Sequence, residues 1–240
     1  MEAVVQLHQI SHRFDKKWII KDINLNIQRG EIFGLLGPSG SGKTTLVKMM
    51  TGILSPVKGE VFVFGEKMPS LNQMKRYGFM AQSDALYQEL TARENLDFFG
   101  SIYRLNKAQR KQRIAEVMEM VDLTEHLDQV VENYSGGMKR RLSLAAALIH
   151  QPDLIILDEP TVGIDPVLRQ SIWDELHQLK DKGVTIIVTT HVMDEAEKCD
   201  RLAMIRDGEV IASNTPSQLK EEIQATTIEE VFLHYGRSNS

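Results

Sequence analysis

Residues 37–44 read Gly37-Pro-Ser-Gly-Ser-Gly-Lys43-Thr44, which is the spacing of a phosphate-binding loop. The loop follows an apolar segment, residues 32–36, and precedes a helical pattern, as such a loop must. Its glycines let the backbone fold tightly, so that N–H groups face phosphate oxygens at the positive end of the helix. The alternative is a glycine-rich turn with an ordinary surface lysine, and the strand and helix on either side disfavour it.

The loop also carries side chains suited to a magnesium nucleotide. Lys43 is expected to neutralise the β- and γ-phosphates, and the Thr44 hydroxyl to bind Mg²⁺. The expected nucleotide-binding residues here are Gly37, Pro38, Ser39, Gly40, Ser41, Gly42, Lys43, Thr44 and Thr45.

A second apolar segment, residues 154–157, ends in the adjacent carboxylates Asp158 and Glu159. At the carboxyl edge of a parallel sheet these acids would lie beside the phosphate-binding loop. Asp158 is then expected to hold Mg²⁺ through water, and Glu159 to polarise the attacking water as a general base. The two acids could instead form a solvated turn before Pro160, but their pairing with the loop favours the catalytic interpretation.

Short apolar, β-branched segments alternate with helical patterns over most of the chain, which predicts an α/β fold with a mostly parallel sheet. The expected strands are residues 4–7, 19–27, 32–36, 61–64, 78–81, 154–157, 185–189 and 202–205.

The stretch 91–149 differs, because its signals are almost all helical. Thr91 and Glu94 form a capping box, and Asn106 begins a charged amphipathic helix that runs to Val121. Further on, Asp207-Gly208 predicts a hairpin turn, and weak helices begin at Pro216 and Thr227. We therefore predict one domain over residues 1–240, with a core at 1–90 and 150–213, a helical insert at about 91–149 and a helical tail at 214–240.

Composition limits the partners. The 33 acids and 28 bases give a net charge of -5 and are spread through the sequence, so we expect no nucleic-acid partner.

Cys199 is the single cysteine, which favours a reducing compartment such as the cytoplasm. We expect neither a signal peptide at residues 1–10 nor a membrane span, since no stretch reaches about 18 apolar residues.

Tyr134-Ser135-Gly136-Gly137-Met138 opens the last helix of the insert, with Ser135 at the N-cap; alone it is merely a capped helix. With the loop before it and the two acids after it, however, the chain resembles the ATP-binding cassette (ABC) family over roughly residues 4–208. Tyr134 stands where the family usually has leucine, and Met138 where it often has glutamine. Neither departure removes a phosphate contact.

The resemblance implies a P-loop NTPase core, an N-terminal antiparallel β subdomain and an inserted α-helical subdomain. It implies that Gln82 senses Mg²⁺ and water, that His191 contacts the γ-phosphate, and that the loop 163–165 links two subunits. The catalytic residues would then be Glu159, His191, Gln82 and Lys43, and the Mg²⁺ ligands Thr44, Gln82 and Asp158. Each has a plainer interpretation: Gln82 as a loop amide, His191 and Asp165 as helix caps.

Phe14 matches the aromatic residue that stacks on adenine in the family. Two alternatives stay open, because Phe14 could be a core ring and Trp18 could take its place.

The resemblance also implies a head-to-tail pair of subunits. ATP bound by Lys43 and Thr44 of one subunit would contact Ser135, Gly136 and Gly137 of the other, which is a second copy or a related subunit.

The expected function is that of the ATP-hydrolysing motor of a transporter, at the cytoplasmic face of the membrane with an integral membrane permease as partner. Residues 30–37, 138–141 and 227–232 look most like exporters of drugs and polysaccharides. The alternatives are a soluble cassette ATPase of DNA repair or translation, and a nucleotide-binding regulatory module without turnover. A long coiled coil would mark a cassette ATPase of DNA repair, and a second cassette would mark one of translation. The presence of both Glu159 and His191 disfavours a regulatory module without turnover.

Overall fold

The computed structural model describes residues 2–83 and 85–238, so residues 1, 84, 239 and 240 of the predicted domain lie outside the described part. Its larger sheet has the order β10-β9-β3-β8-β7-β6. All neighbours pair in parallel except β10, which is antiparallel to β9. The strands are β3 (Ile32–Leu36), β6 (Tyr77–Met80), β7 (Leu154–Asp158), β8 (Thr185–Thr190), β9 (Arg201–Arg206) and β10 (Glu209–Asn214). Every residue of β3, β7 and β8 is buried, as expected of a parallel sheet covered on both faces.

The second sheet is antiparallel, with the order β2-β1-β4-β5. Its strands are β1 (Ala3–Phe14), β2 (Lys17–Gln28), β4 (Lys58–Val63) and β5 (Glu66–Lys67). This confirms the expected N-terminal antiparallel part of the fold. The prediction of a strand ending at Leu7 was wrong, because β1 continues to Phe14 through register shifts after Leu7, with Gln9 at φ 50°.

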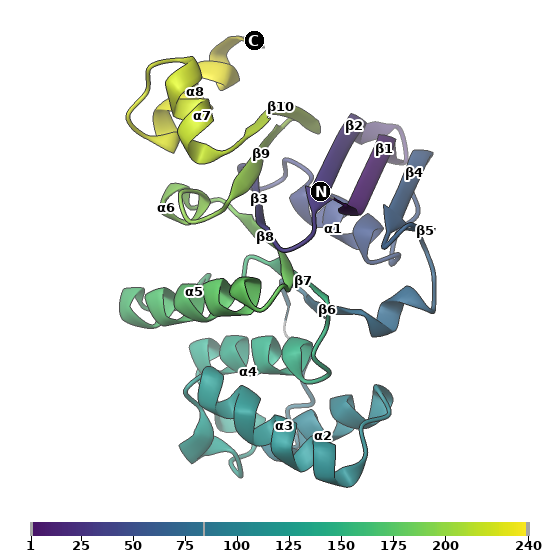
Figure 1. Cartoon of the computed structure of the whole chain (residues 1–240), viewed down its shortest axis with the longest axis vertical. Helices are drawn as coiled ribbons and strands as arrows, with labels where there is room; N and C mark the ends of the chain where they lie inside the picture. Colours follow the sequence, from purple (N-terminus) through teal and green to yellow (C-terminus); the bar gives the residue numbers. More distant parts are fainter. Residues whose placement is uncertain (1, 84, 239–240) are drawn as a thin grey trace.

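The helical stretch contains α2 (Ala92–Ile102), α3 (Lys107–Met120) and α4 (Gly136–Leu148), and Figure 1 shows it at one end of the molecule. The capping box of Thr91 and Glu94 is confirmed. Asn106 caps α3 in the same way with Gln109, and Val121 ends that helix as predicted. Short 3₁₀ turns at Thr124–His126 and Val131–Asn133 connect α3 to α4.

The remaining helices are α1 (Lys43–Met50), α5 (Pro166–Asp181), α6 (Met193–Ala196), α7 (Pro216–Glu222) and α8 (Ile228–Ser238), with a 3₁₀ turn at Gln73–Lys75. The predicted hairpin at Asp207-Gly208 joins β9 to β10, with φ of 51° and 82° at its two residues. Helices α7 and α8 follow, drawn in yellow at the other end of Figure 1. Among the described residues no helix is both long and apolar enough to span a membrane.

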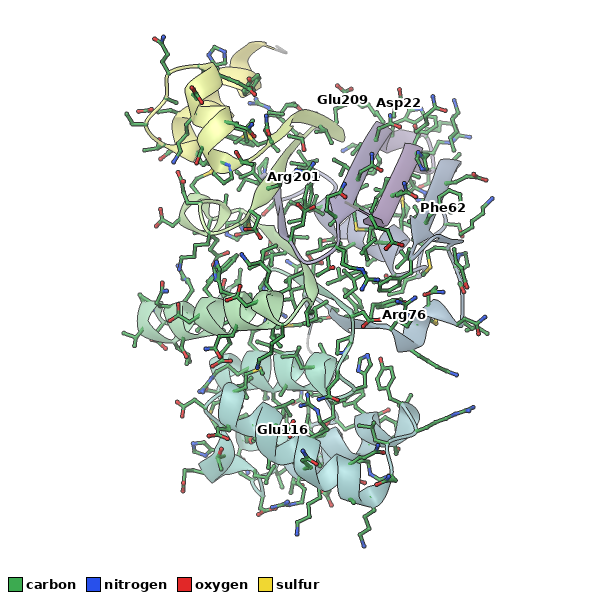
Figure 2. The ribbon with its side chains drawn as sticks, in the orientation of Figure 1. Asp22, Phe62, Arg76, Glu116, Arg201 and Glu209 are labelled. Carbon is green, nitrogen blue, oxygen red and sulfur yellow. The ribbon has the colours of Figure 1, made fainter. Side chains whose placement is uncertain are left out.

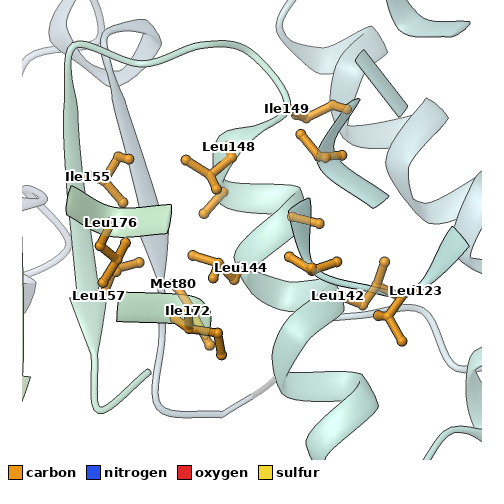
Figure 3. Packing of buried hydrophobic residues seen from close by; sticks show 14 of the residues in the cluster. Met80, Leu123, Leu142, Leu144, Leu148, Ile149, Ile155, Leu157, Ile172 and Leu176 are labelled. Carbon is orange, nitrogen blue, oxygen red and sulfur yellow. The ribbon is translucent and has the colours of Figure 1, made fainter. Parts of the chain in front are cut away.

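Helix α4 joins the insert to the larger sheet through one apolar core. Figure 3 shows Leu144 and Leu148 of α4 near Met80 of β6 and Leu157 of β7, with Ile172 of α5 alongside. All five side chains are at most 4% exposed. The position of α4 is therefore tied to the strand that ends in Asp158.

Polar contacts connect the two sheets. Figure 2 labels Arg201 of β9, whose Nη1 donates to the carbonyl of Asn26 at 3.3 Å and to Glu31 Oε1 at 3.0 Å. Glu209, also labelled, pairs with Lys21 of β2 at 3.3 Å. These contacts hold the antiparallel sheet, which carries Phe14, against the edge of the parallel one.

His150 lies where the insert meets β6. Its ring stacks on Tyr103 with the centroids 3.6 Å apart and the planes 4° from parallel, and its Nε2 lies 3.2 Å from the carbonyl of Tyr77. Burial lowers the pKa of His150 from 6.5 to about 4, although the Tyr77 carbonyl opposes this, and the charge of Arg113 lowers it further. The imidazole is therefore held neutral in the folded protein.

We expect acid to weaken the fold through His150. Because its folded pKa lies below its unfolded one, its contribution is complete above about pH 6.5 and is lost as the pH falls towards about 4. Between about pH 7.5 and 5 the wild type should lose roughly 2 kcal/mol more unfolding free energy than His150→Phe, which keeps a ring against Tyr103 and takes up no proton. Urea unfolding at the two pH values measures this. Equal losses in the two proteins would contradict it.

Candidate functional site

The phosphate-binding loop connects β3 to α1 and can be built only with glycine at key positions. Gly40 and Gly42 have φ of 81° and 109°. A Cβ on Gly42 would lie 2.5 Å from Ile20 Cδ1, and one on Gly37 would lie 2.3 Å from the carbonyl oxygen of Ile205. Gly42 is the N-cap of α1 and offers no side-chain cap, so the first N–H groups of this helix are left for a ligand.

Lys43 is folded back over this loop. Its Nζ donates to the carbonyls of Gly37 at 2.7 Å and Pro38 at 3.1 Å, and it lies 3.8 Å from Glu159 Oε1. The side chain is 5% exposed. Burial lowers the pKa of Lys43, while the charges of Glu159 and Asp158 oppose that shift. The ammonium group thus sits between the loop and the two acids.

Glu159 is the point on which the expected catalytic side chains converge. Its Oε2 accepts from Gln82 Nε2 at 3.3 Å, and its Oε1 lies 3.2 Å from His191 Nδ1 as well as 3.8 Å from Lys43 Nζ. Glu159 itself has φ 53°, a left-handed conformation at the turn after β7. The four residues expected to act together therefore do meet in the folded chain.

Asp158 is 1% exposed and is held by Thr189, whose hydroxyl donates to Asp158 Oδ1 at 2.5 Å and accepts from the Glu159 amide at 2.9 Å. The other carboxylate oxygen of Asp158 is buried without a hydrogen-bond partner, and so is Ser41 Oγ. Mg²⁺ prefers such oxygen donors, so these residues fit the expected ion. No group of three or more His, Cys, Asp or Glu side chains in the described residues could hold a metal alone, so nucleotide oxygens would have to complete the coordination.

A pocket of about 450 Å³ opens over these groups. Its lining is Phe14, Lys17, Ile19, Ser39, Gly40, Gly42, Lys43, Thr44, Thr45, Gln82 and Glu159. Phe14 is 51% exposed, so it is not a core ring. Trp18 is not among the lining residues, and its ring lies instead beside Arg13 and Lys58, 5.4 and 5.6 Å from the ring centroid. This arrangement favours Phe14 over Trp18 as the aromatic residue next to a bound base.

The Ser135-Gly136-Gly137 segment lies elsewhere. Ser135 caps α4, its hydroxyl accepting from the Met138 amide at 3.2 Å, and both Ser135 and Gly136 are exposed. A Cβ on Gly137 would have only the Gly163 carbonyl within 4 Å, at 3.9 Å. None of the three residues lines the pocket that contains Lys43. Asp165, in the adjoining loop, accepts a hydrogen bond from the Leu168 amide at 3.0 Å and so caps α5. The interpretation of Asp165 as a helix cap is therefore confirmed.

One buried carboxylate near the site was not predicted from the sequence. Glu195 is 2% exposed and accepts hydrogen bonds from Thr190 at 2.6 Å and from Thr161. It thereby joins the segment after Glu159 to the residue before His191. In the sequence it lies between Asp194 and Glu197, in a short acidic stretch interrupted by Ala196, where nothing marks it as buried.

Arg140 was missed as well, although a signal was present. It donates to carbonyls at the ends of both β6 and β7. Its position lies four and seven residues before Leu144 and Ala147, both buried, so helical periodicity places all three on one face of α4.

The chain matches the sequence model of a family described as ABC transporter over residues 20–162. It is 43% identical over 230 residues to the linearmycin resistance ATP-binding protein LnrL of Bacillus subtilis, covering 94% of this chain and 73% of that one. It is 41% identical over 233 residues to the Nod factor export ATP-binding protein I of Burkholderia thailandensis, covering 96% and 77%. The probable multidrug ABC transporter ATP-binding protein YbhF of Escherichia coli is 39% identical over 239 residues, or 97% of this chain and 41% of that longer one.

Solved structures share the architecture. An ATP-binding subunit of an ABC transporter superposes with a TM-score of 0.89 over 97% of this chain and 99% of that one, at 24% identity, which supports the fold alone. A dimeric ATP-binding cassette in a post-hydrolysis state, with ADP and Pi bound, gives a TM-score of 0.82 at 29% identity and covers 88% of this chain and 98% of that one.

Replacing Lys43 tests whether the pocket is the nucleotide site. Lys43→Ala removes a charge-assisted donor and should weaken ATP binding by roughly 10- to 100-fold, with turnover falling too. Binding of a fluorescent ATP analogue measures the affinity. Lys48→Ala, at an exposed position of the same helix, should bind as the wild type does. An unchanged affinity in Lys43→Ala would remove this pocket from consideration.

Proposed function

The chain belongs to the ABC transporter family of ATP-binding proteins, and on that premise we propose that it is the motor subunit of an exporter, hydrolysing MgATP through Glu159. The convergence of Lys43, Gln82 and His191 on Glu159 is the observation that carries this proposal. The names of the relatives, which refer to linearmycin resistance, multidrug transport and Nod factor export, support export as the direction.

Glu159 acts as the general base. Its carboxylate accepts a proton from a water molecule, whose oxygen attacks the γ-phosphorus while the bond to the oxygen of the leaving ADP breaks. Gln82 and His191 fix the orientation of the carboxylate by their contacts with its two oxygens. Lys43 exchanges its carbonyl partners for phosphate oxygens, and His191, which is 44% exposed, reaches the γ-phosphate. Mg²⁺, held by Thr44, Gln82 and Asp158, would neutralise negative charge on the β- and γ-phosphates when bound.

Phe14 stacks on the adenine at the rim of the pocket. The loop residues Gly37 to Thr45 bind the phosphates through backbone N–H groups and the hydroxyls of Ser39, Ser41, Thr44 and Thr45.

A second subunit completes each site. Ser135 and Gly136 are exposed at the start of α4, where a helix offers N–H groups to an anion. Two chains placed head to tail would bring this helix start onto the γ-phosphate bound by the other chain. ATP then joins the two subunits, and its hydrolysis releases them. The dimeric cassette among the similar structures supports this arrangement.

The membrane partner docks beside Gln82. A cavity of about 110 Å³ lies between the end of β6 and the insert, with apolar lining from Leu86, Phe99 and Tyr103 among others. Tyr87 and Phe98, 47% and 39% exposed, meet edge to face next to it at 5.0 Å. We infer that a cytoplasmic helix of a permease sits here, with this chain bound peripherally on the cytoplasmic face. The alternative of a soluble cassette in DNA repair or translation is not favoured, because the similar proteins are named for export and resistance.

Glu159→Gln tests the function. The amide keeps the side chain's size but accepts no proton, so turnover should fall by about 10² or more while ATP binding stays within a few-fold. Steady-state phosphate release measures turnover, and light scattering with saturating MgATP should reveal a stable dimer. Glu119→Gln, on the exposed face of α3, serves as the control and should match the wild type. Full turnover in Glu159→Gln would mean that another group is the base.

A further inference from the structure

Arg140 is a buried guanidinium in α4, five residues after Ser135 and 6% exposed. Its Nη1 donates to the carbonyls of Ala81 at 2.7 Å and Gln82 at 2.9 Å. Its Nη2 donates to the carbonyl of Glu159 at 2.6 Å and to that of Asp158. One side chain therefore bridges the segment that follows β6 and the end of β7.

These carbonyls need such a donor. Met80 and Leu157 are the last residues paired between β6 and β7, so the carbonyls beyond them leave this ladder in a partly buried place. Figure 3 shows Met80 and Leu157 facing α4, from which the guanidinium comes. A planar fork can serve two carbonyls on each side at once, whereas a lysine ammonium is a point donor on a flexible stem.

Gln82 and Glu159, whose backbone carbonyls both bind Arg140, are also joined through their side chains. Gln82 Nε2 donates to Glu159 Oε2 at 3.3 Å, while Arg140 binds the backbone carbonyl of each. The relative position of Gln82 and Glu159 is thus set twice, and one of the two links originates on α4.

We propose that Arg140 is a positioning residue that fixes Glu159 and Gln82 relative to each other. Through Arg140, the position of the Glu159 carboxylate depends on the position of α4. This inference rests on the proposed function, in which Glu159 is the base. Since Ser135 caps α4, contact of Ser135 with a nucleotide on the other subunit is transmitted along this helix to Arg140 and from there to the backbone of Glu159. The end of β7 then takes its catalytic position only when α4 contacts the nucleotide of the other subunit.

Arg141 provides a matched control on the same helix. Its Nη1 donates to the carbonyls of Val121 and Asp122, both at 2.8 Å, and its side chain is 12% exposed. Its replacement removes the same kind of hydrogen bond inside the insert, away from the pocket.

The test compares Arg140→Met with Arg141→Met, using kcat, KM and the affinity for a fluorescent ATP analogue. Misplacing a catalytic group by about 1 Å can cost about 10²-fold, so kcat of Arg140→Met should fall by that order. Its ATP affinity should stay within about threefold, because the phosphate-binding loop is untouched, and Arg141→Met should keep kcat within about threefold. Arg140→Lys should fall in between, because it keeps the charge and loses the fork.

A second measurement keeps the proposal testable if Arg140→Met folds poorly. Arg140→Ala leaves a space for free guanidinium, and low concentrations of guanidinium chloride should raise its kcat severalfold, with no gain in Arg141→Ala or in the wild type. Sodium chloride at equal ionic strength is the control.

The proposal is overturned if Arg140→Met keeps wild-type kcat, if Arg141→Met loses as much, if ATP affinity falls as far as kcat, or if guanidinium restores nothing. Failure of the proposed function looks different. In that case Glu159→Gln retains wild-type turnover whatever the arginine variants do.

Discussion

The site depends on one constraint, which is that a buried ammonium and two carboxylates share the carboxyl edge of the parallel strands of one sheet. The strand order β3-β8-β7-β6 arranges the functional groups in sequence along that edge. Lys43 follows β3, His191 follows β8, and Gln82 follows β6. Asp158 is the last residue of β7, and Glu159 comes directly after it. Each group lies far from the others in the chain, yet Glu159 is within 3.8 Å of Lys43, His191 and Gln82. A buried charge is tolerated here because its partners are fixed by the same sheet.

Strand β8 lies between β3, which precedes Lys43, and β7, which ends in Asp158, and its side chains hold groups on both faces of the sheet. Thr189 and Thr190 are adjacent on β8 and point to opposite faces, as strand geometry requires. The first holds Asp158 and the Glu159 amide, and the second binds Glu195. Arg140 adds a link from the insert. The carboxylate expected to accept the proton is therefore held from the sheet, from the loop of His191 and from α4.

Local motifs made much of this predictable. The phosphate-binding loop, the acids after a buried strand and the capping box of Thr91 and Glu94 are set by neighbours a few residues away, and sequence shows such neighbours directly. The full length of β1 was not predictable, since the positive φ of Gln9 breaks the alternation that marks a strand. Helical periodicity places Arg140 on the buried face of α4, but its carbonyl partners come from other segments and cannot be identified from the sequence. The same holds for the two hydroxyls that donate to Glu195. The choice of Phe14 over Trp18 likewise required the position of the pocket.

The pocket of one chain is lined by the phosphate-binding loop and Glu159, whereas Ser135, Gly136 and Gly137 lie outside its lining. The central claim is that a second subunit supplies them. Mixing two inactive variants, Lys43→Ala and Ser135→Arg, tests it most directly, because one interface of their heterodimer joins an intact Lys43 to an intact Ser135. Single-turnover ATP hydrolysis in the mixture should exceed the sum of the two separate preparations. If heterodimers form and close with ATP, yet hydrolysis shows no recovery, the site is not built between two subunits.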